Sequence, residues 1–299
     1  MARHILLTGG TGFLGSHILD RLVSDGWPVV VLIRKTSNED RIRHLKGRYA
    51  TFSLDGNGGN IDELFTNYDV EAIIHTATEY GRGASMTAVM ETNVMLPLKL
   101  VEEGVKHGLD FFMNTDSFFA KKRNLNSSYL NHYAKSKDIL RDILAGGGLK
   151  LKIASLRLEH VFGENDSEQK FVTSVFRKLL LNVKEIPLTE GLQKRDFIYV
   201  GDVVDAFLKV LENRDKLKEF SEFEVGRGRS MMVRDFVEKA AGIAHSSSKL
   251  LFGRIENRPG EIEDSSADIS ALTEIGWKAG YSIDEAIEKV FKTERNILK

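Results

Sequence analysis

The chain of 299 residues predicts an α/β fold with a doubly wound parallel sheet and a smaller C-terminal lobe. Three observations lead to this prediction. Short apolar runs alternate with helical patterns over residues 1–160, a glycine-rich turn follows the first apolar run, and the alternation loosens after about Leu158. We therefore expect a sheet domain over residues 1–160, to which some later segments return, and a second domain made mainly of residues 161–299.

The expected strands are short, and helical patterns alternate with them along the chain. They are the apolar runs at residues 5–7, 29–33, 72–74, 111–113 and 153–156. The run VVVLI at 29–33 is apolar on both faces, as a central strand of a parallel sheet must be. Because strand and helix alternate, we expect right-handed crossovers between parallel strands. The helices of these crossovers are expected to cover both faces of the sheet, which makes it doubly wound.

The helices are predicted from apolar residues that recur on one face. The first of them follows the glycine-rich turn, ends near Gly26, and carries Leu14, Ile18, Leu19, Leu22 and Val23 on its apolar face. Pro97 lies inside a helical pattern from about Met86 to His107, so we expect a kink or a break there. Later helical patterns cover residues 171–181, 203–211, 233–244 and 283–291.

The composition excludes several classes of protein. Lys plus Arg number 42 and Asp plus Glu 43, so the net charge of −1 gives no basic excess for binding nucleic acid. The chain has no cysteine, which excludes disulfides, thiolate catalysis and zinc–thiolate sites. The apolar runs are too short for a membrane helix, and no paired-histidine motif points to a metal. We expect a cytoplasmic enzyme that uses no metal and binds no membrane.

The glycine-rich turn LLTGGTGFLG predicts a dinucleotide site. Gly9, Gly12 and Gly15 lie between a strand and a helix, where glycine lets the backbone approach a pyrophosphate and the helix N-terminus attracts its charge. A nucleoside-triphosphate loop is excluded because no Gly-Lys-Ser/Thr follows. The candidate cofactor-binding residues in the turn also include its non-glycine members Thr11, Phe13 and Leu14.

The end of the second strand selects between the two nicotinamide dinucleotides. An acidic residue there would bind the ribose hydroxyls of NAD, whereas this chain has Arg34 and Lys35. A guanidinium suits a 2′-phosphate, so NADP(H) is favoured and NAD(H) remains possible. Asp55, after the next strand, is a candidate acceptor for the adenine amino group, with a plain turn aspartate as the alternative.

Tyr133 and Lys137 are a candidate proton-transfer pair. They are four residues apart in a helical pattern, so they share one face, and none of the other tyrosines has a lysine at the same spacing. A phenol has a pKa near ~10, and a neighbouring ammonium is expected to lower it. Such a pair suits proton exchange with a carbinol oxygen while hydride moves at the adjacent carbon.

Taken together, TGGTGFLG, YAKSK and RDFIYVGDV resemble the extended short-chain dehydrogenase/reductase family of nucleotide-sugar epimerases, dehydratases and reductases. The resemblance covers essentially the whole chain. It implies a Rossmann domain with a small substrate lobe, usually in a homodimer. It also implies cofactor contacts for the strand-end segment His75, Thr76 and Ala77 and for the helix residue Asn93.

The same resemblance assigns the segment NTDSFF to the strand that carries the catalytic hydroxyl. That hydroxyl falls on Thr115, and Asp116 is a second catalytic candidate. The family's 4,6-dehydratases have Thr-Asp-Glu at this place, whereas this chain has Ser117 third, which argues against a dehydratase. The candidate substrate-binding residues are Thr78, Ser117, His160, Arg195 and Arg258, of which the two arginines would bind a nucleotide diphosphate.

The leading hypothesis is therefore an NADP(H)-dependent reductase of the C4 ketone of a nucleotide-activated deoxysugar. Tyr133 would protonate the oxygen, Lys137 would hold the nicotinamide ribose, and Thr115 would orient the carbonyl. The main alternative is a 4-epimerase that uses the same residues with tightly bound NAD. Two weaker hypotheses are a non-catalytic NADP-binding sensor and a reductase of apolar ketones, and the two arginines argue against the latter.

Overall fold

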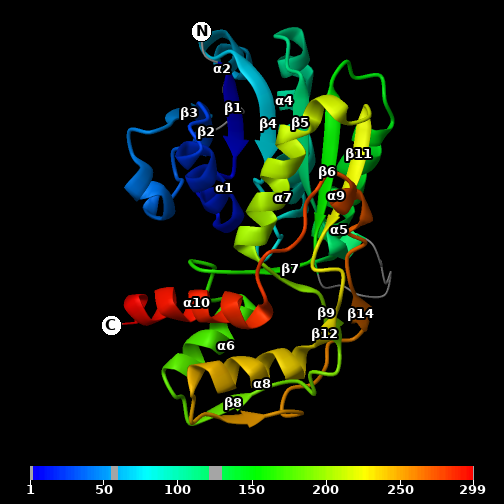
Figure 1. Cartoon of the computed structure of the whole chain (residues 1–299). Coiled ribbons are helices and arrows are strands. Elements are labelled where there is room, and N and C mark those ends of the chain that lie inside the picture. The colour runs from blue at the N-terminus through cyan, green and yellow to red at the C-terminus, as the bar shows by residue number, and fades with distance from the viewer. Residues whose placement is uncertain (1–2, 55–59, 121–129, 299) are drawn as a thin grey trace. The chain divides into compact units, whose positions relative to one another are not determined.

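The computed structural model describes residues 3–54, 60–120 and 130–298 (Figure 1). Asp55 lies outside these residues. The described chain forms two compact units, one of residues 3–54, 60–120, 130–157 and 207–223, and one of residues 158–206 and 224–298. Each unit has its own core and is described by itself. Assignment of cofactor binding to one and substrate binding to the other stays a prediction.

The first unit is built around a seven-stranded sheet with the order β11-β6-β5-β4-β1-β2-β3. Its strands are β1 (His4–Thr8), β2 (Val29–Arg34), β3 (Ala50–Leu54), β4 (Val70–His75), β5 (Phe111–Ser117), β6 (Lys152–Leu158) and β11 (Phe220–Val225). The pairs from β3 to β5 are parallel, with Leu7 of β1 opposite both Val31 and Ile74. The predicted doubly wound fold and its five strands are confirmed. The periodicity gave no sign of β11, which returns from late in the chain.

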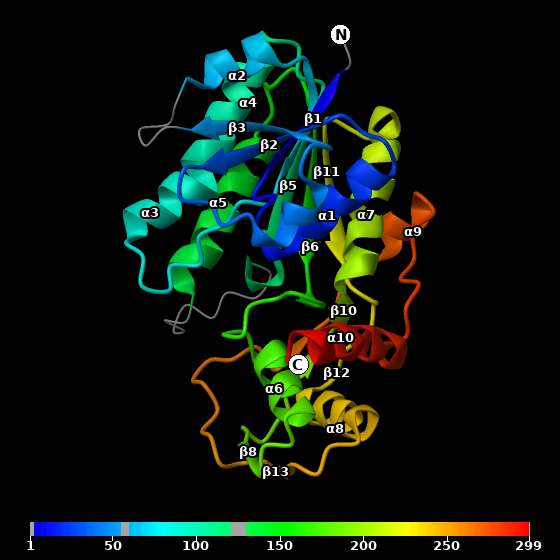
Figure 2. The same cartoon turned by 90° about the vertical axis from the view of Figure 1, so that its left-hand side faces the viewer.

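Helices cover both faces of this sheet (Figure 2). The helix α1 (Phe13–Ser24) lies on one face, and α2 (Ile61–Asn67), α4 (Leu96–Lys106) and α5 (Asn131–Ala145) lie on the other. The core beneath the second group joins sheet residues such as Leu6 and Phe112 to Leu100 of α4 and Leu140 of α5, and all four are fully buried. Short helical turns η1 (Asp40–Leu45), η3 (Phe118–Ala120) and η4 (Arg214–Lys216) complete the unit.

The helix that contains Pro97 is interrupted, as predicted, and the interruption lies before the proline. The helix α3 (Met86–Met90) leads into a single π-helical segment, η2 (Glu91–Met95), and α4 begins at Leu96 with Pro97 in its first turn. Proline lacks an N–H and is tolerated in a first turn. The π segment holds Asn93, which is fully buried.

The second unit joins short strand pairs to helices that pack on aromatic rings. The strands are β7 (His160–Phe162), β8 (Glu185–Pro187), β9 (Lys194–Arg195), β10 (Phe197–Tyr199), β12 (Met231–Met232), β13 (Lys249–Leu251) and β14 (Asp264–Ser265). The helices are α6 (Phe171–Leu180), α8 (Val233–Ala244), α9 (Ser270–Glu274) and α10 (Ile283–Ile297), and α7 (Val200–Glu212) starts here. Phe236 stacks on Phe197 with ring centroids 3.9 Å apart and on Phe176 at 5.8 Å. The four later helices predicted from periodicity are all present.

Candidate active site

The glycine-rich turn fits closely against the end of β4, and glycine is required there. Gly9 has φ +69°, and a Cβ on it would lie 2.5 Å from the backbone nitrogen of Ala77. A Cβ on Gly15 would lie 2.1 Å from the carbonyl oxygen of Gly9. Gly12 is the N-cap of α1 and has no capping side chain, so the N–H groups of the first turn stay available to an anion. These features fit the pyrophosphate of a dinucleotide.

Hydrogen bonds join the ends of β1 and β4 below this turn. The Thr8 hydroxyl lies 2.8 Å from Nδ1 of His75 and accepts a hydrogen bond from the Ala77 N–H, and the Thr76 hydroxyl donates to the Thr8 carbonyl. His75 is fully buried, and burial first, then the charge of Lys137, lowers its pKa to about 3. The imidazole is therefore neutral, and its Nε2 has no hydrogen-bond partner among the described residues.

Arg34 and Lys35 lie at the exposed end of β2. The chain turns directly after them, since the Ser37 hydroxyl accepts from the Arg34 N–H and the Ser37 N–H donates to the Arg34 carbonyl. Because β1 and β2 are neighbouring parallel strands, this turn lies at the same edge of the sheet as the glycine-rich turn. Thr11, Phe13 and Leu14 lie in the glycine-rich turn and the first turn of α1, half-buried.

Tyr133 lies in the first turn of α5 and is 6% exposed. Its ring packs against the ring of Tyr80 at 4.9 Å between centroids and against Phe119 at 6.3 Å, and its hydroxyl forms a hydrogen bond with Ser117. Burial, followed by the neighbouring Tyr80, raises the pKa of the phenol well above 10. The prediction that Lys137 lowers this pKa is wrong for the structure, because desolvation of the phenol outweighs any effect of the ammonium.

Lys137 follows one turn later and is 1% exposed. Its Nζ lies 5.8 Å from the centroid of the Tyr133 ring, donates to the Thr115 carbonyl at 2.8 Å and donates to the Thr78 hydroxyl at 3.1 Å. Burial lowers the pKa of the ammonium to about 8, although the charge of Asp116 opposes that effect. Thr78, predicted as a substrate residue, therefore contacts Lys137 in this structure.

Thr115 and Asp116 lie together on β5, and their side chains have different surroundings. The Thr115 hydroxyl is buried, and within the described residues it has no hydrogen-bond partner. The Asp116 carboxylate is fully buried, accepts from the Ser117 N–H at 2.8 Å, and pairs with Arg157 at 3.2 Å and Arg141 at 3.7 Å. Burial raises the pKa of Asp116, and the N–H group and the arginines oppose that rise.

Asn93 connects Tyr133 to the segment after β4. Its Oδ1 accepts from the Glu79 N–H at 2.8 Å, and its Nδ2 donates to the Glu79 carbonyl and to the Ser136 hydroxyl, each at 2.9 Å. The Ser136 hydroxyl in turn donates to the Tyr133 carbonyl at 2.7 Å. The asparagine thus positions the backbone on both sides of the Tyr80–Tyr133 contact. Sequence spacing gave no signal for this network.

The substrate-binding candidates His160, Arg195 and Arg258 lie in the second unit. Arg195 is 4% exposed and donates to the Lys194 carbonyl at 2.7 Å and to Glu261 at 2.9 Å. The exposed Arg258 belongs to the turn that carries Glu261, whose N–H donates to the Arg258 carbonyl. The turn thus links the backbone of Arg258 to the residue that pairs with Arg195. The His160 ring packs edge-on against Phe197 at 5.9 Å, and burial lowers its pKa.

A buried carboxylate beside His160 was missed by the sequence analysis. Glu159 is 4% exposed, and both of its oxygens accept from the Ser265 hydroxyl, at 2.9 and 2.8 Å. Its Oε2 lies 3.9 Å from Nδ1 of His160. Glu159 and Ser265 are 106 residues apart, so no local pattern could have predicted that they meet.

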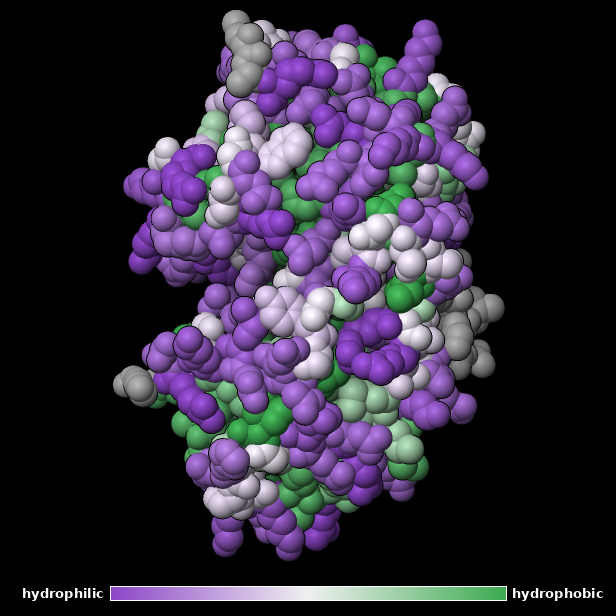
Figure 3. All heavy atoms as spheres, in the orientation of Figure 1, coloured by the Kyte–Doolittle hydropathy of each residue, from purple (hydrophilic) through white to green (hydrophobic). Residues whose placement is uncertain are grey.

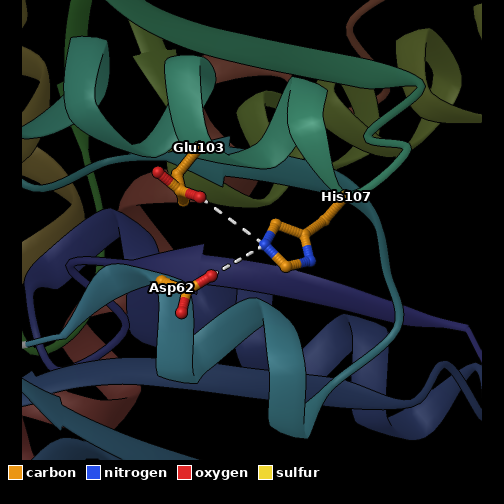
Figure 4. A group of neighbouring side chains, drawn as sticks. All are labelled: Asp62, Glu103 and His107. Carbon is orange, nitrogen blue, oxygen red and sulfur yellow. Dashed lines mark hydrogen bonds and ion pairs between the residues drawn. The ribbon is translucent and has the colours of Figure 1, made fainter.

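One group of potential metal ligands occurs in the part of the chain that the structure describes. Figure 4 shows Asp62 of α2 and Glu103 of α4 directed at the ring of His107, just after α4. The His107 Nε2 lies 3.1 Å from Asp62 and 3.5 Å from Glu103, and Lys106 pairs with Glu103 at 2.7 Å. The aspartate lies in the first turn of α2, where the helix dipole favours a negative charge. The contacts explain the cluster as a hydrogen-bonded link between two helices.

A family model described as the NAD dependent epimerase/dehydratase family matches residues 5–226. The chain belongs to this family. The resemblance inferred from the glycine-rich turn, the YAKSK segment and RDFIYVGDV is therefore confirmed.

Among curated relatives, the CDP-abequose synthase of Salmonella typhimurium is 34% identical over 98% of both chains. A putative UDP-glucose 4-epimerase of Methanocaldococcus jannaschii is 26% identical over 98% of both chains. Among solved structures, UDP-glucose 4-epimerase of Thermotoga maritima with UDP-glucose has a TM-score of 0.86 and 22% identity, and the match covers 99% of this chain and 100% of that one. The structural likeness confirms the fold.

None of the described helices combines the length and the apolar character that crossing a membrane requires. On the face shown in Figure 3, hydrophobic residues lie in small groups among hydrophilic ones.

Proposed function

We propose that this chain is an NADP(H)-dependent reductase of the C4 ketone of a nucleotide-activated 4-keto-deoxysugar. The observation that carries the proposal is the group at the end of β5, where Lys137 donates to the Thr115 carbonyl and lies beside the ring of Tyr133, at the sheet edge that also carries the glycine-rich turn. The two CDP-abequose synthases, each 34% identical to the chain, support this chemistry.

Each residue of the group has a distinct part in the proposed reaction. The cofactor, when bound, supplies hydride to C4. Tyr133 donates its phenolic proton to the C4 oxygen, and burial keeps that proton on the phenol before the reaction. The Thr115 hydroxyl orients the ketone by donating to the same oxygen, and Lys137 provides a buried positive charge one helical turn from the phenol.

The binding residues also fit this proposal. The tight turn at Gly9 and Gly15 fits the pyrophosphate of a dinucleotide, and Arg34 with Lys35 fits a 2′-phosphate, which favours NADP(H) over NAD(H). Arg195 and Arg258 would bind the diphosphate of the sugar nucleotide, and Arg195 would then exchange Glu261 for a phosphate oxygen. Ser117 in place of a glutamate supports reduction over water elimination.

A homodimer is part of the proposal. The helix α5 exposes Ile139 (39%) and Ile143 (47%), and Met95, just before α4, is 40% exposed. Apolar side chains on neighbouring helices of one sheet face suit a contact between two copies of the chain. Because NADPH and nucleotide sugars are cytoplasmic metabolites, the reaction is proposed for the cytoplasm.

A 4-epimerase is the second candidate function, because the solved structures similar in fold include several 4-epimerases. In that case Tyr133 would take the proton from the C4 oxygen and later return it. Tightly bound NAD, when present, would supply the hydride chemistry, taking hydride from C4 and giving it back to the other face.

The deciding experiment measures NADPH absorbance while the purified protein acts on a CDP-4-keto-3,6-dideoxy sugar. A reductase consumes one NADPH for each hydroxyl formed, and Tyr133→Phe abolishes that consumption. Turnover of a 4-hydroxy nucleotide sugar without added nicotinamide would instead establish the epimerase. If the protein binds NADPH but changes neither substrate, the catalytic proposal is wrong.

A further inference from the structure

We propose that Thr78 is a positioning residue for Lys137, and that its hydroxyl keeps the buried ammonium charged and correctly placed. The inference rests on the proposed function, which needs a cation beside Tyr133. It goes beyond that function, because Thr78 acts here through the lysine and was expected to contact substrate.

The first argument is the geometry of the ammonium. Lys137 is 1% exposed, and an ammonium has three N–H donors. Two acceptors meet it among the described residues: the Thr115 carbonyl at 2.8 Å and the Thr78 hydroxyl at 3.1 Å. Of these two, only the hydroxyl belongs to a side chain that can be replaced without changing the backbone.

The second argument is the charges that face Lys137 from the surrounding elements. Asp116 on β5 raises the lysine pKa through its charge, but its carboxylate pairs with Arg157 and Arg141, and no ion pair joins it to Nζ. His75 on β4 is neutral. Tyr133, one turn earlier on α5, keeps its proton. Direct stabilisation of the ammonium therefore comes from the two neutral oxygens.

The third argument is that the position of Thr78 is fixed by the fold. It follows Thr76 and Ala77, whose groups hydrogen-bond to Thr8 at the end of β1, and it precedes Glu79, whose N–H and carbonyl are both bonded to Asn93. The backbone is thus held on both sides of Thr78, so the hydroxyl stays within reach of Nζ.

The consequence concerns the protonation state of the lysine. Burial lowers its pKa to about 8, close to the pH at which an enzyme works. Loss of one acceptor makes the charged form less favourable, and a hydrogen bond to a charged group corresponds to about one pH unit. Without the Thr78 hydroxyl, about half of Lys137 would be neutral at pH 7.

The test is a titration by NMR of protein labelled with 13C-lysine, with the Lys137 Cε signal assigned by its loss in Lys137→Met. Thr78→Val keeps the shape of the side chain and removes the hydroxyl, and Thr78→Ser keeps the hydroxyl. We expect the midpoint of Lys137 to fall by about one pH unit in Thr78→Val and to stay near the wild-type value in Thr78→Ser. The alkaline limb of the pH profile of kcat/KM, along which Lys137 loses its proton, should move to lower pH by the same amount.

Thr273→Val is the matched control, because the Thr273 hydroxyl donates to the Ile269 carbonyl in an exposed helix of the second unit. An unchanged midpoint in Thr78→Val, or an equal fall in Thr78→Ser, would overturn the proposal. Thr78→Ala, which also lacks the hydroxyl, decides the question should the valine variant not fold. The titration needs neither substrate nor cofactor, so it tests Thr78 even if the reductase assay fails.

Discussion

At the residue scale, Tyr133 and Lys137 share one physical condition: burial favours the neutral form of each. The phenol pKa rises above its usual range and the ammonium pKa falls to about 8. For the tyrosine this suits the role of a proton donor. For the lysine, burial opposes the proposed role, because the proposed chemistry needs Lys137 in its charged form. The stability of the protein therefore depends on the charge of Lys137.

Replacing Lys137 by methionine should stabilise the protein at pH 7 and abolish turnover. The folded pKa of about 8 lies below the unfolded value of 10.5, so this lysine contributes stability above pH 10.5 and loses it as the pH falls through 8. Removing the buried charge is expected to raise the free energy of unfolding by about 1–3 kcal/mol at neutral pH. Denaturant titration of both proteins checks this. A variant less stable than the wild type at pH 7 contradicts it.

Replacing Arg34 by alanine should weaken binding of NADPH about tenfold and leave NADH almost unchanged. The exposed guanidinium at the end of β2 is the proposed partner of the 2′-phosphate, and a charged hydrogen bond of this kind contributes on the order of 1.5 kcal/mol or more. Fluorescence titration with both cofactors checks the prediction, with NADH as the internal control. An equal loss of affinity for NADPH and NADH would show that Arg34 does not bind the 2′-phosphate.

At the element scale, the π segment Glu91–Met95 holds the buried polar side chain of Asn93. Asn93 uses all three of its hydrogen bonds on Glu79 and Ser136, and both partners lie next to residues of the Tyr80–Tyr133 contact. π segments inside helices are frequently found at functional sites. The polar network therefore couples helix geometry to the position of the phenol.

Replacing Asn93 by alanine should lower the free energy of unfolding by about 2–4 kcal/mol, because it leaves several buried groups without partners. Turnover should fall further than stability alone explains, since the Tyr133 backbone loses its support. Asn67→Ala, at the exposed end of α2, is the control and should change stability little. The measurements are denaturant titration and kcat. Full activity in a destabilised Asn93→Ala protein would argue against the coupling.

At the scale of the whole molecule, the sequence predicted the elements well and the interactions between them poorly. The strands follow from short apolar runs, and the later helices follow from apolar residues that repeat every 3.6 positions. The glycine-rich turn and the Tyr133–Lys137 pair follow from local motifs. The pairing of Asp116 with Arg157 joins residues 41 apart, and no local pattern predicts it. The direction of the Tyr133 pKa was wrong for the same reason: burial depends on the packing of distant segments.

The stability of the molecule in acid should depend on His75. The pKa of His75 is about 3 in the folded protein and 6.5 in the unfolded chain. Its contribution to the free energy of unfolding is therefore lost as the pH falls from 6.5 towards 3. Between pH 7 and pH 5 this amounts to about 2 kcal/mol. His75→Gln, which cannot take up a proton, should flatten the dependence of the melting temperature on pH over that interval. An unchanged slope would show that other groups dominate.

The π segment has a consequence for the number of residues in the helix around Pro97. A π turn contains one residue more than the α-helical turn it replaces. Deleting a single residue from Glu91–Met95 would restore a regular helix and rotate everything on its N-terminal side by about 100°. Asn93 would then turn away from Glu79 and Ser136. Chain length in this stretch is thus fixed by geometry, and one-residue deletions should be far less tolerated here than in the exposed turn around Gly147.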